Sequence, residues 1–214
     1  MARLKDQKRR TASSRAWLTR QISDPYVERA KREGFRSRAA FKLAEIDDRY
    51  KLLKHGARVV DLGAAPGGWS EIAARRVGDK GRVIALDILD MKPVAGVEFL
   101  QLDFLDPSAP ARLEAMLGRG EKAHVVLSDM AANATGHRQT DHLRIMALAE
   151  AAADFAGQVL APGGAFVCKV LQGGTEAALL AELKREFASV KHVKPPASRS
   201  DSAELYLLAQ GFRG

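Results

Sequence analysis

Four aspartates follow short apolar runs at intervals along the sequence. The runs VVDLG, VIALD, FLQLD and VVLSD contain, in that order, Asp61, Asp87, Asp103 and Asp129. Because the carboxyl ends of parallel strands meet at one edge of a sheet, these side chains would form an acidic rim there. Such a rim favours a cationic ligand, such as a sulfonium, over an anionic one. The alternative for any single aspartate is that it caps the helix after its strand.

A glycine-rich turn follows the first of these runs and precedes a helical pattern. In DLGAAPGGWS, Gly63 and Gly67 let the backbone approach a ligand closely, which favours a nucleotide-like cofactor. The spacing lacks the GxGxxG pattern of dinucleotide-binding proteins, and Pro66 removes a backbone donor, so a neutral or cationic cofactor fits better than a diphosphate. Asp87 could accept both hydroxyls of a ribose, although nicotinamide enzymes also carry an acid there. Asp103 could reach an adenine amino group.

A lysine interrupts one of the most apolar segments of the chain. Lys169 lies in GAFVCKVL, at a predicted strand end where an unpaired buried charge would be costly, so we interpret it as functional. The adjacent Cys168 is the single cysteine and cannot form an internal disulfide, so we expect a small buried hydrophobe. The histidines show no spacing typical of metal ligands, and no metal site is predicted.

The segments that must position these residues alternate between strand and helix patterns. Strands are expected at ARVVDLG, GRVIALD, VEFLQLD, HVVLSDM and AFVCKVL, and helices at residues 68–78, 108–118, 141–160 and 175–188. An earlier helix in SRAAFKLAEIDDRYKLL, with Ser37 as its cap, precedes the first strand. VKHVKPP and ELYLLAQGF predict a final hairpin that closes the sheet edge. The alternation predicts an α/β fold with a mostly parallel sheet and helices on both faces.

Positive charge is concentrated at the beginning of the chain. The net charge is +8, but residues 1–42 hold 13 Lys/Arg against four Asp/Glu, which leaves 21 against 22 for residues 43–214. Cations interleaved with aromatic residues are typical of surfaces that bind nucleic acids. We therefore predict a basic, flexible arm over residues 1–24, a single domain over residues 25–214, and a nucleic-acid partner.

The sequence contains no evident segment for membrane insertion or export. No run reaches about 18 apolar residues, the length that a membrane span needs. The basic N-terminus lacks the apolar stretch of a secretory signal, although a basic start with serines can imitate an organellar transit peptide. We therefore expect a cytoplasmic protein without a membrane role. A length of 214 residues leaves little room for a second domain.

Several motifs together resemble one family. DLGAAPGGWS, ALDIL, LDFLD, SDMAAN, APGGAFVCKVLQG and SDSAELYLLAQGF are similar to the FtsJ/RrmJ ribosomal RNA 2′-O-methyltransferases, from about residue 14 to the C-terminus. One departure is Ala132, where the family usually has proline, so the loop there is expected to be more mobile. The resemblance implies a Rossmann-like methyltransferase fold that depends on S-adenosyl-L-methionine, with a seven-stranded sheet whose last strand is antiparallel.

Cofactor contacts follow from the residues and this resemblance together. They are predicted at Asp61, Gly63, Gly67, Trp69, Asp87, Asp103 and Asp129. For Trp69, which opens the helix after the glycine turn, the alternative is a core anchor for that helix. No such alternative explains the whole set of strand-end acids as well as a cofactor does.

The resemblance also implies a catalytic tetrad, which falls on Lys42, Asp129, Lys169 and Glu204. A ribose hydroxyl is a poor nucleophile until a positioned base takes its proton. Lys169 is the candidate base and Asp129 would orient it, while Lys42 and Glu204 would position the hydroxyl and a neighbouring phosphate. Lys169 could instead only steer the hydroxyl, because a base must be uncharged, and nearby carboxylates oppose that state. Lys42 and Glu204 could also be plain surface residues.

The resemblance points to a uridine ribose of 23S rRNA within the large ribosomal subunit, methylated by a monomer. Relatives of this fold modify tRNA or mRNA caps instead. Two other classes remain open. A nicotinamide-dependent oxidoreductase would share the fold, although the broken GxGxxG pattern and the basic arm argue against it. A non-catalytic RNA-binding or assembly factor would keep the basic arm without needing Lys169 and Asp129 together.

Overall fold

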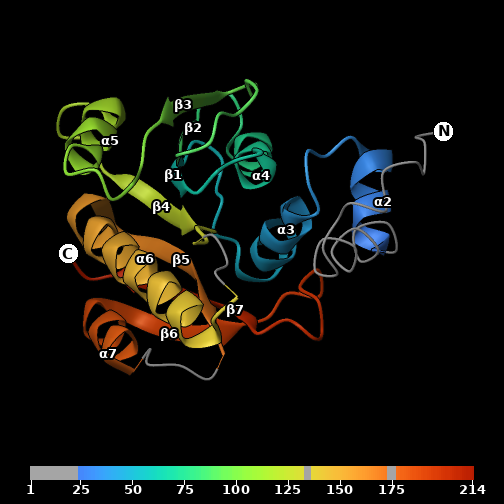
Figure 1. Ribbon diagram of the computed structural model, residues 1–214. Helices are drawn as coiled ribbons and strands as arrows, with labels where there is room; N and C mark the ends of the chain where they lie inside the picture. The colour runs from blue at the N-terminus through green and yellow to red at the C-terminus, as the bar shows by residue number, and fades with distance from the viewer. Residues whose placement is uncertain (1–23, 133–135, 173–176) are drawn as a thin grey trace.

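The computed structural model describes residues 24–132, 136–172 and 177–214, and its centre is one seven-stranded sheet (Figure 1). The strands are β1 (Arg58–Leu62), β2 (Arg82–Asp87), β3 (Val97–Gln101), β4 (Ala123–Ser128), β5 (Leu160–Leu171), β6 (Phe187–Val193) and β7 (Glu204–Phe212). Their order is β3-β2-β1-β4-β5-β7-β6. Strands β1 to β5 pair in parallel, whereas β7 is antiparallel to β5 and β6. The mostly parallel sheet, the final hairpin and the antiparallel last strand are confirmed.

Helices cover both faces of the sheet, as the sequence pattern predicted (Figure 1). They are α2 (Pro25–Glu33), α3 (Ala39–Tyr50), α4 (Gly68–Val77), α5 (Ala109–Leu117), α6 (Arg138–Val159) and α7 (Ala177–Glu186). Helices α3 and α4 pack on one face, and α5, α6 and α7 pack on the other. Within the described residues, no helix combines the length and the apolar character that crossing a membrane requires.

Some of the expected features lie in segments outside the described residues. The predicted arm over residues 1–24 lies outside the described residues except for Asp24, and so do residues 133–135 of the loop that Ala132 was expected to loosen. The helix expected at 175–188 is described only from Ala177. Helix α6 begins at Arg138, before the expected start at residue 141, and β5 begins at Leu160, before AFVCKVL.

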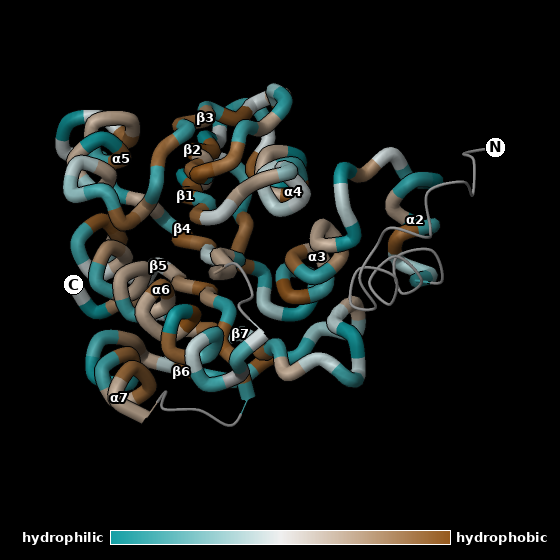
Figure 2. The backbone as a smooth tube through the Cα atoms, in the orientation of Figure 1, coloured by the Kyte–Doolittle hydropathy of each residue, from teal (hydrophilic) through white to brown (hydrophobic). Residues whose placement is uncertain are grey.

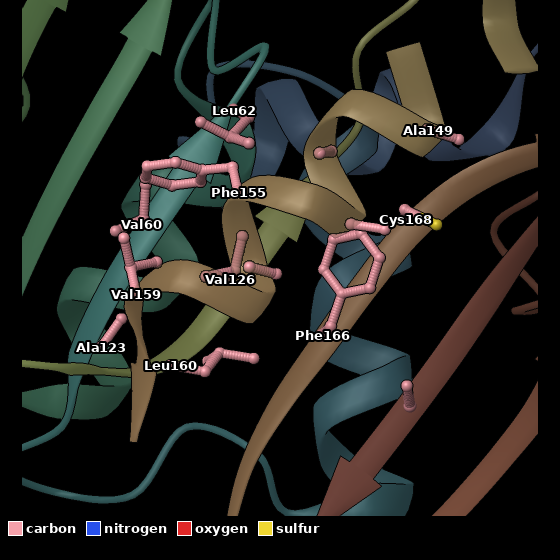
Figure 3. Packing of buried hydrophobic residues seen from close by; sticks show 14 of the residues in the cluster. Val60, Leu62, Ala123, Val126, Ala149, Phe155, Val159, Leu160, Phe166 and Cys168 are labelled. Carbon is pink, nitrogen blue, oxygen red and sulfur yellow. The ribbon is translucent and has the colours of Figure 1, made fainter. Parts of the chain in front are cut away.

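Alternate strand residues divide the interior into two apolar layers. In β1, Val59 faces α3 and α4, whereas Val60 faces α6 on the other side. Phe155 of α6 and Val60 belong to the same buried cluster as Phe166 of β5, and Cys168, also on β5, is fully buried, as expected (Figure 3). Hydrophobic residues run along the strands at the centre (Figure 2). Burial on both faces explains why their sequences are nearly continuous apolar runs.

Helix α3 begins differently from the prediction. Arg38 occupies its N-cap position and no side chain caps the helix. The Ser37 hydroxyl has no hydrogen-bond partner among the described residues and lies over Gly68 at the start of α4. The predicted Ser37 cap is therefore wrong, because close packing of α3 on α4 turns that hydroxyl away from the helix end. Helix α2 does have a cap, since the Asp24 carboxylate accepts a hydrogen bond from the Tyr26 N–H (3.0 Å).

Strand β7 inserts between β5 and β6, although it follows β6 in the chain. Its register places Tyr206 opposite Lys169 and Glu204 opposite Leu171. Asp129 directly follows β4, the parallel neighbour of β5 on the other side. Three strands that are distant in sequence therefore bring their polar residues to one edge of the sheet.

Candidate active site

The glycine turn predicted as a cofactor loop connects β1 to α4. Gly63 has a φ of 77°, and a β-carbon there would come within 2.7–2.8 Å of Met130, so only glycine fits. Asp87 fixes the turn from the end of β2, because its carboxylate accepts hydrogen bonds from the N–H groups of Ala65 and Leu89, both at 2.8 Å. The turn is therefore held in one conformation from two sides.

A cavity of about 540 Å³, called here the cofactor cavity, opens beside this turn at the carboxyl ends of the parallel strands. The predicted cofactor residues that line it are Gly63, Asp87, Asp103 and Asp129. Ile88 and Leu105 add apolar surface to its wall and are 61% and 60% exposed. A cavity of this size, with a few polar groups among apolar walls, is typical of a small-molecule site.

Asp61 lies behind the cofactor cavity rather than on its wall. Its Oδ2 accepts a hydrogen bond from the Ser70 hydroxyl (2.6 Å), while its Oδ1 has no hydrogen-bond partner among the described residues. The pKa of Asp61 is raised to about 7, first by complete burial and then by the negative charges of Asp129 and Asp87, although the Ser70 hydrogen bond opposes this. The carboxylates of the acidic rim therefore repel one another, and a bound cation would reduce this repulsion.

Two other predicted cofactor residues do not line the cavity. The indole of Trp69 is 2% exposed, packs against Tyr206 with ring centroids 5.4 Å apart, and donates a hydrogen bond to the Ala39 carbonyl (2.9 Å). Gly67 has a φ of 104°, and a β-carbon there would come within 3.0 Å of Arg36. The Trp69 side chain is therefore the core anchor that the sequence left as an alternative. A cofactor contact from Trp69 would have to come from its backbone.

The first pair of predicted catalytic residues meets at the wall of the cofactor cavity. Lys169 Nζ lies 3.2 Å from Asp129 Oδ1 and donates a hydrogen bond to the Asp129 backbone carbonyl (2.6 Å). The Lys169 side chain is 6% exposed and that of Asp129 is 18% exposed. The pair is therefore shielded from solvent, and the Asp129 partner compensates the charge buried in the apolar strand.

A second ion pair is joined to the first by a tyrosine. Lys42 Nζ, on α3, lies 3.0 Å from Glu204 Oε2, on β7. The Tyr206 hydroxyl accepts a hydrogen bond from Lys42 (3.2 Å) and donates one to Asp129 Oδ1 (2.9 Å). The structure thus brings all four predicted catalytic residues into one network, which we call the tetrad network.

Sequence reasoning missed Tyr206, the link in this network. Burial raises its pKa well above the usual range, and the charges of Asp129 and Glu204 add to this effect. The phenol therefore stays protonated, and its single proton is available for Asp129. A signal was present in the sequence, because Tyr206 lies two positions after Glu204 in a strand and so shares its face.

A second cavity, of about 310 Å³, lies on the Lys42–Glu204 side of the tetrad network, and we call it the acceptor cavity. Arg38 and Arg199 also line it. Asp24 holds both arginines, with Oδ2 at 2.7 Å from Arg38 Nη1 and 3.0 Å from Arg199 Nη2. The acceptor cavity therefore presents three cationic side chains and two carboxylates, those of Asp201 and Glu204. The cofactor cavity presents three carboxylates and one cation, Arg144. This arrangement suits a cationic donor that reacts with an anionic acceptor.

The family model for FtsJ-like methyltransferases matches residues 35–212, a segment that holds the cofactor cavity and the whole tetrad network. The chain belongs to this family. The resemblance inferred from the motifs and the expected methyltransferase fold are thereby confirmed. The nicotinamide-dependent oxidoreductase is excluded, because it would share the general fold but not the FtsJ-like family.

Named relatives of this FtsJ-like methyltransferase are similar over nearly their full length. "Ribosomal RNA large subunit methyltransferase E" of Azorhizobium caulinodans is 63% identical over 215 residues, which cover 99% of this chain and 89% of the relative. The protein of the same name from Bradyrhizobium diazoefficiens is 65% identical over 209 residues, with 96% and 91% covered. A crystal structure of a proposed ribosomal RNA methyltransferase from Plasmodium falciparum has a TM-score of 0.76 at 30% identity and covers 84% of this chain and 100% of its own.

As an FtsJ-like methyltransferase, the chain requires a methyl donor, and the cofactor cavity fits a positively charged one. Asp87, Asp103 and Asp129 present carboxylates to it. Behind them lies the buried carboxyl of Asp61, whose Oδ1 has no hydrogen-bond partner among the described residues. Gly63 and Met130, which approach each other closely, complete the wall of the cofactor cavity.

Proposed function

We propose that this protein transfers the methyl group of S-adenosyl-L-methionine to a ribose 2′-hydroxyl, in a uridine of 23S rRNA within the large ribosomal subunit. The names of the curated relatives refer to the RNA of that subunit, which supports this substrate. The observation that carries the chemistry is the contact of Lys169 with Asp129, at the boundary between the cofactor cavity and the side lined by Lys42 and Glu204.

The cofactor cavity suits S-adenosyl-L-methionine in size and charge. Asp87 would accept hydrogen bonds from the ribose hydroxyls, and Asp103 would accept one from the adenine amino group. When bound, the cofactor supplies an electrophilic methyl group on a sulfonium. The carboxylates of Asp87, Asp103 and Asp129 on the cavity wall favour such a cation over a neutral or anionic ligand.

Lys169 is the proposed general base. Lys169 Nζ donates a hydrogen bond to the Asp129 backbone carbonyl and lies 3.2 Å from Asp129 Oδ1. In the uncharged amine, these two contacts leave the lone pair of Nζ for the proton of the ribose hydroxyl. Asp129 therefore sets the direction of that lone pair. Lys169 would take the proton of the ribose hydroxyl as the ribose oxygen bonds to the methyl carbon and the methyl–sulfur bond breaks, which would leave the cofactor as a neutral thioether. A rate that does not depend on deprotonation of Lys169 would restrict this residue to positioning.

The acceptor side positions the RNA. Lys42, held by Glu204 and Tyr206, is placed to contact the ribose or its phosphate. Arg38 and Arg199 add positive charge beside it. The basic arm over residues 1–24 would extend this surface from a single domain at 25–214, since phosphate contacts supply most of the sequence-independent affinity for RNA.

The test is transfer of labelled methyl from S-adenosylmethionine to purified large subunits, protein-free rRNA and tRNA in parallel. We compare the wild type with Lys169→Ala and with Lys184→Ala, a control on the exposed part of α7. Ribose label on the large subunit is expected, with a loss of at least about 100-fold in Lys169→Ala alone. Label only on tRNA would contradict the proposal that the large subunit is the substrate. Full activity of Lys169→Ala would contradict the proposal that Lys169 is the general base.

The other function left open by the sequence is that of a non-catalytic factor for ribosome assembly. The buried Lys169–Asp129 pair argues against it, because RNA binding alone does not need this pair. Expression of Lys169→Ala in a deletion strain separates the two roles. Full rescue of large-subunit assembly by the variant would show that methyl transfer is dispensable.

We also propose that the protein acts as a monomer in the cytoplasm, which light scattering and cell fractionation can check.

A further inference from the structure

A third cavity, of about 430 Å³, lies at the opposite edge of the sheet from the tetrad network, and we call it the distal cavity. It forms where α3 ends and where β1 and β4 begin, beside residues 162–165 of β5. His124 of β4 lines this cavity, whereas Asp129 follows the other end of the same strand. At a rise of about 3.3 Å per residue, the two positions are about 16 Å apart along the strand.

The ionisable side chains that line the distal cavity are all basic. Lys51, Lys54, His55 and His124 line it, and no aspartate or glutamate of the described chain does. Both lysines are exposed, and neither forms an ion pair with another described residue. Residues 43–214 as a whole carry 21 Lys/Arg against 22 Asp/Glu, so a lining with basic groups alone differs from the average of this segment. The nearest acid to His55 is Asp79, 3.7 Å from its Nε2 and itself exposed.

Backbone features distinguish two of these residues. Lys51 ends α3 with a φ of 55°, and no other non-glycine of the described residues has a positive φ. Glycine or asparagine is the usual residue there, so a lysine is uncommon at this position. His124 Nδ1 accepts a hydrogen bond from the Arg58 N–H (2.9 Å), which leaves Nε2 as the donor of the neutral ring. Burial and the charges of Arg58 and Lys54 lower the His124 pKa, although Glu121 opposes them.

We propose that the distal cavity binds a phosphodiester of the substrate RNA, remote from the methylated ribose. Lys51 and Lys54 would neutralise the phosphate, and His124 would supply a hydrogen-bond donor. The inference rests on the proposed function only in taking RNA as the substrate. Because the two sites lie at opposite edges of the sheet, a short oligonucleotide in the acceptor cavity does not reach the distal cavity. A long, folded RNA can contact both.

The test measures RNA affinity of the full-length protein across a range of salt concentrations. Lys51→Gln/Lys54→Gln is compared with Lys184→Gln/Arg185→Gln, an exposed pair on α7 outside all three cavities that removes the same charge. The probes are a large-subunit rRNA transcript and a uridine-containing trinucleotide. For the transcript, we expect about tenfold weaker binding by the cavity variant and a log–log salt slope lower by about 1, because one phosphate contact contributes about 0.9. Trinucleotide binding should not change.

Equal losses in the two double variants would overturn the proposal, because net charge alone would then explain them. Unchanged transcript binding by the cavity variant would overturn it too. Inorganic phosphate and ATP form a second arm: stabilisation of the wild type alone against heat, with unchanged transcript binding, would mean a site for free phosphate and not for RNA. Circular dichroism confirms that each variant is folded. Methyl transfer by the wild type is measured in parallel, so a failure of the proposed function is recognised separately.

Discussion

At the scale of single residues, the Tyr206 hydroxyl links the two ion pairs of the tetrad network, since it joins Lys42 to Asp129. Tyr206→Phe keeps the ring against Trp69 but leaves Asp129 without this donor. Because hydrogen bonds to charged groups contribute about 1.5–3 kcal/mol, we expect kcat to fall at least about tenfold with little change in KM for the methyl donor. Steady-state kinetics measure this, with Tyr50→Phe as the control outside the network. Equal kcat values for the wild type and Tyr206→Phe would show that the hydroxyl is dispensable.

Asp61 should make stability depend on pH. Its folded pKa is about 7, against 3.8 as its ordinary value, so between these pH values the folded chain keeps a proton that the unfolded chain has lost. The free energy of unfolding therefore falls as pH rises from about 4 to about 7, by an amount of about 4 kcal/mol in the limit. Asp61→Asn stays neutral, and its amide oxygen can still accept the Ser70 hydrogen bond.

We therefore expect Asp61→Asn to gain stability relative to the wild type as pH increases from 5 to 8. Denaturant unfolding at several pH values measures the difference. Asp201→Asn, an exposed carboxylate, is the control and should show no such trend. A difference between Asp61→Asn and the wild type that is the same at every pH would show that Asp61 is already ionised in the folded protein.

At the scale of elements, the turn between β1 and α4 depends on a close approach to the segment after β4. Gly63→Ala would place a β-carbon 2.7 Å from Met130 Cγ, at a φ of 77°. Gly120→Ala has nearly the same φ, 78°, with nothing within 4 Å, so it isolates the strain of the dihedral from the collision. We expect Gly63→Ala to weaken binding of the methyl donor by about tenfold or more beyond Gly120→Ala, measured by calorimetry. Equal affinities would contradict the role of this contact.

At the scale of the whole molecule, much of the excess positive charge precedes the residues that form the apolar core. The buried apolar clusters of the described residues begin at Ala30, whereas residues 1–23 hold seven Lys/Arg against one acid. Deletion of residues 2–23 should therefore leave the thermal unfolding temperature unchanged and weaken rRNA binding, with a smaller salt dependence. Calorimetry and binding at several salt concentrations test the two halves of this prediction. Loss of folding in the truncated chain would show that the arm belongs to the domain.

The sequence by itself determined the features that depend on neighbours in the chain. Apolar runs flanked by turns predicted the strands of the sheet, because strands buried on both faces need continuous apolar residues. The glycine turn and the acids that follow the strands were visible for the same local reason. Parallel topology then sends their carboxyl ends to one edge, which is why Gly63, Asp87, Asp103 and Asp129 could be grouped in advance.

Only the tertiary structure decided which side chains meet. The insertion of β7 beside β5 places Tyr206 next to Lys169, and no local pattern encodes this pairing of distant segments. Packing of α3 against α4 turns Trp69 into the core and draws Ser37 away from its expected cap. The distal cavity joins the end of a helix to the starts of separate strands, so its basic lining is dispersed in the sequence. Burial and contact between segments far apart in the chain are properties of the fold, and they set these positions.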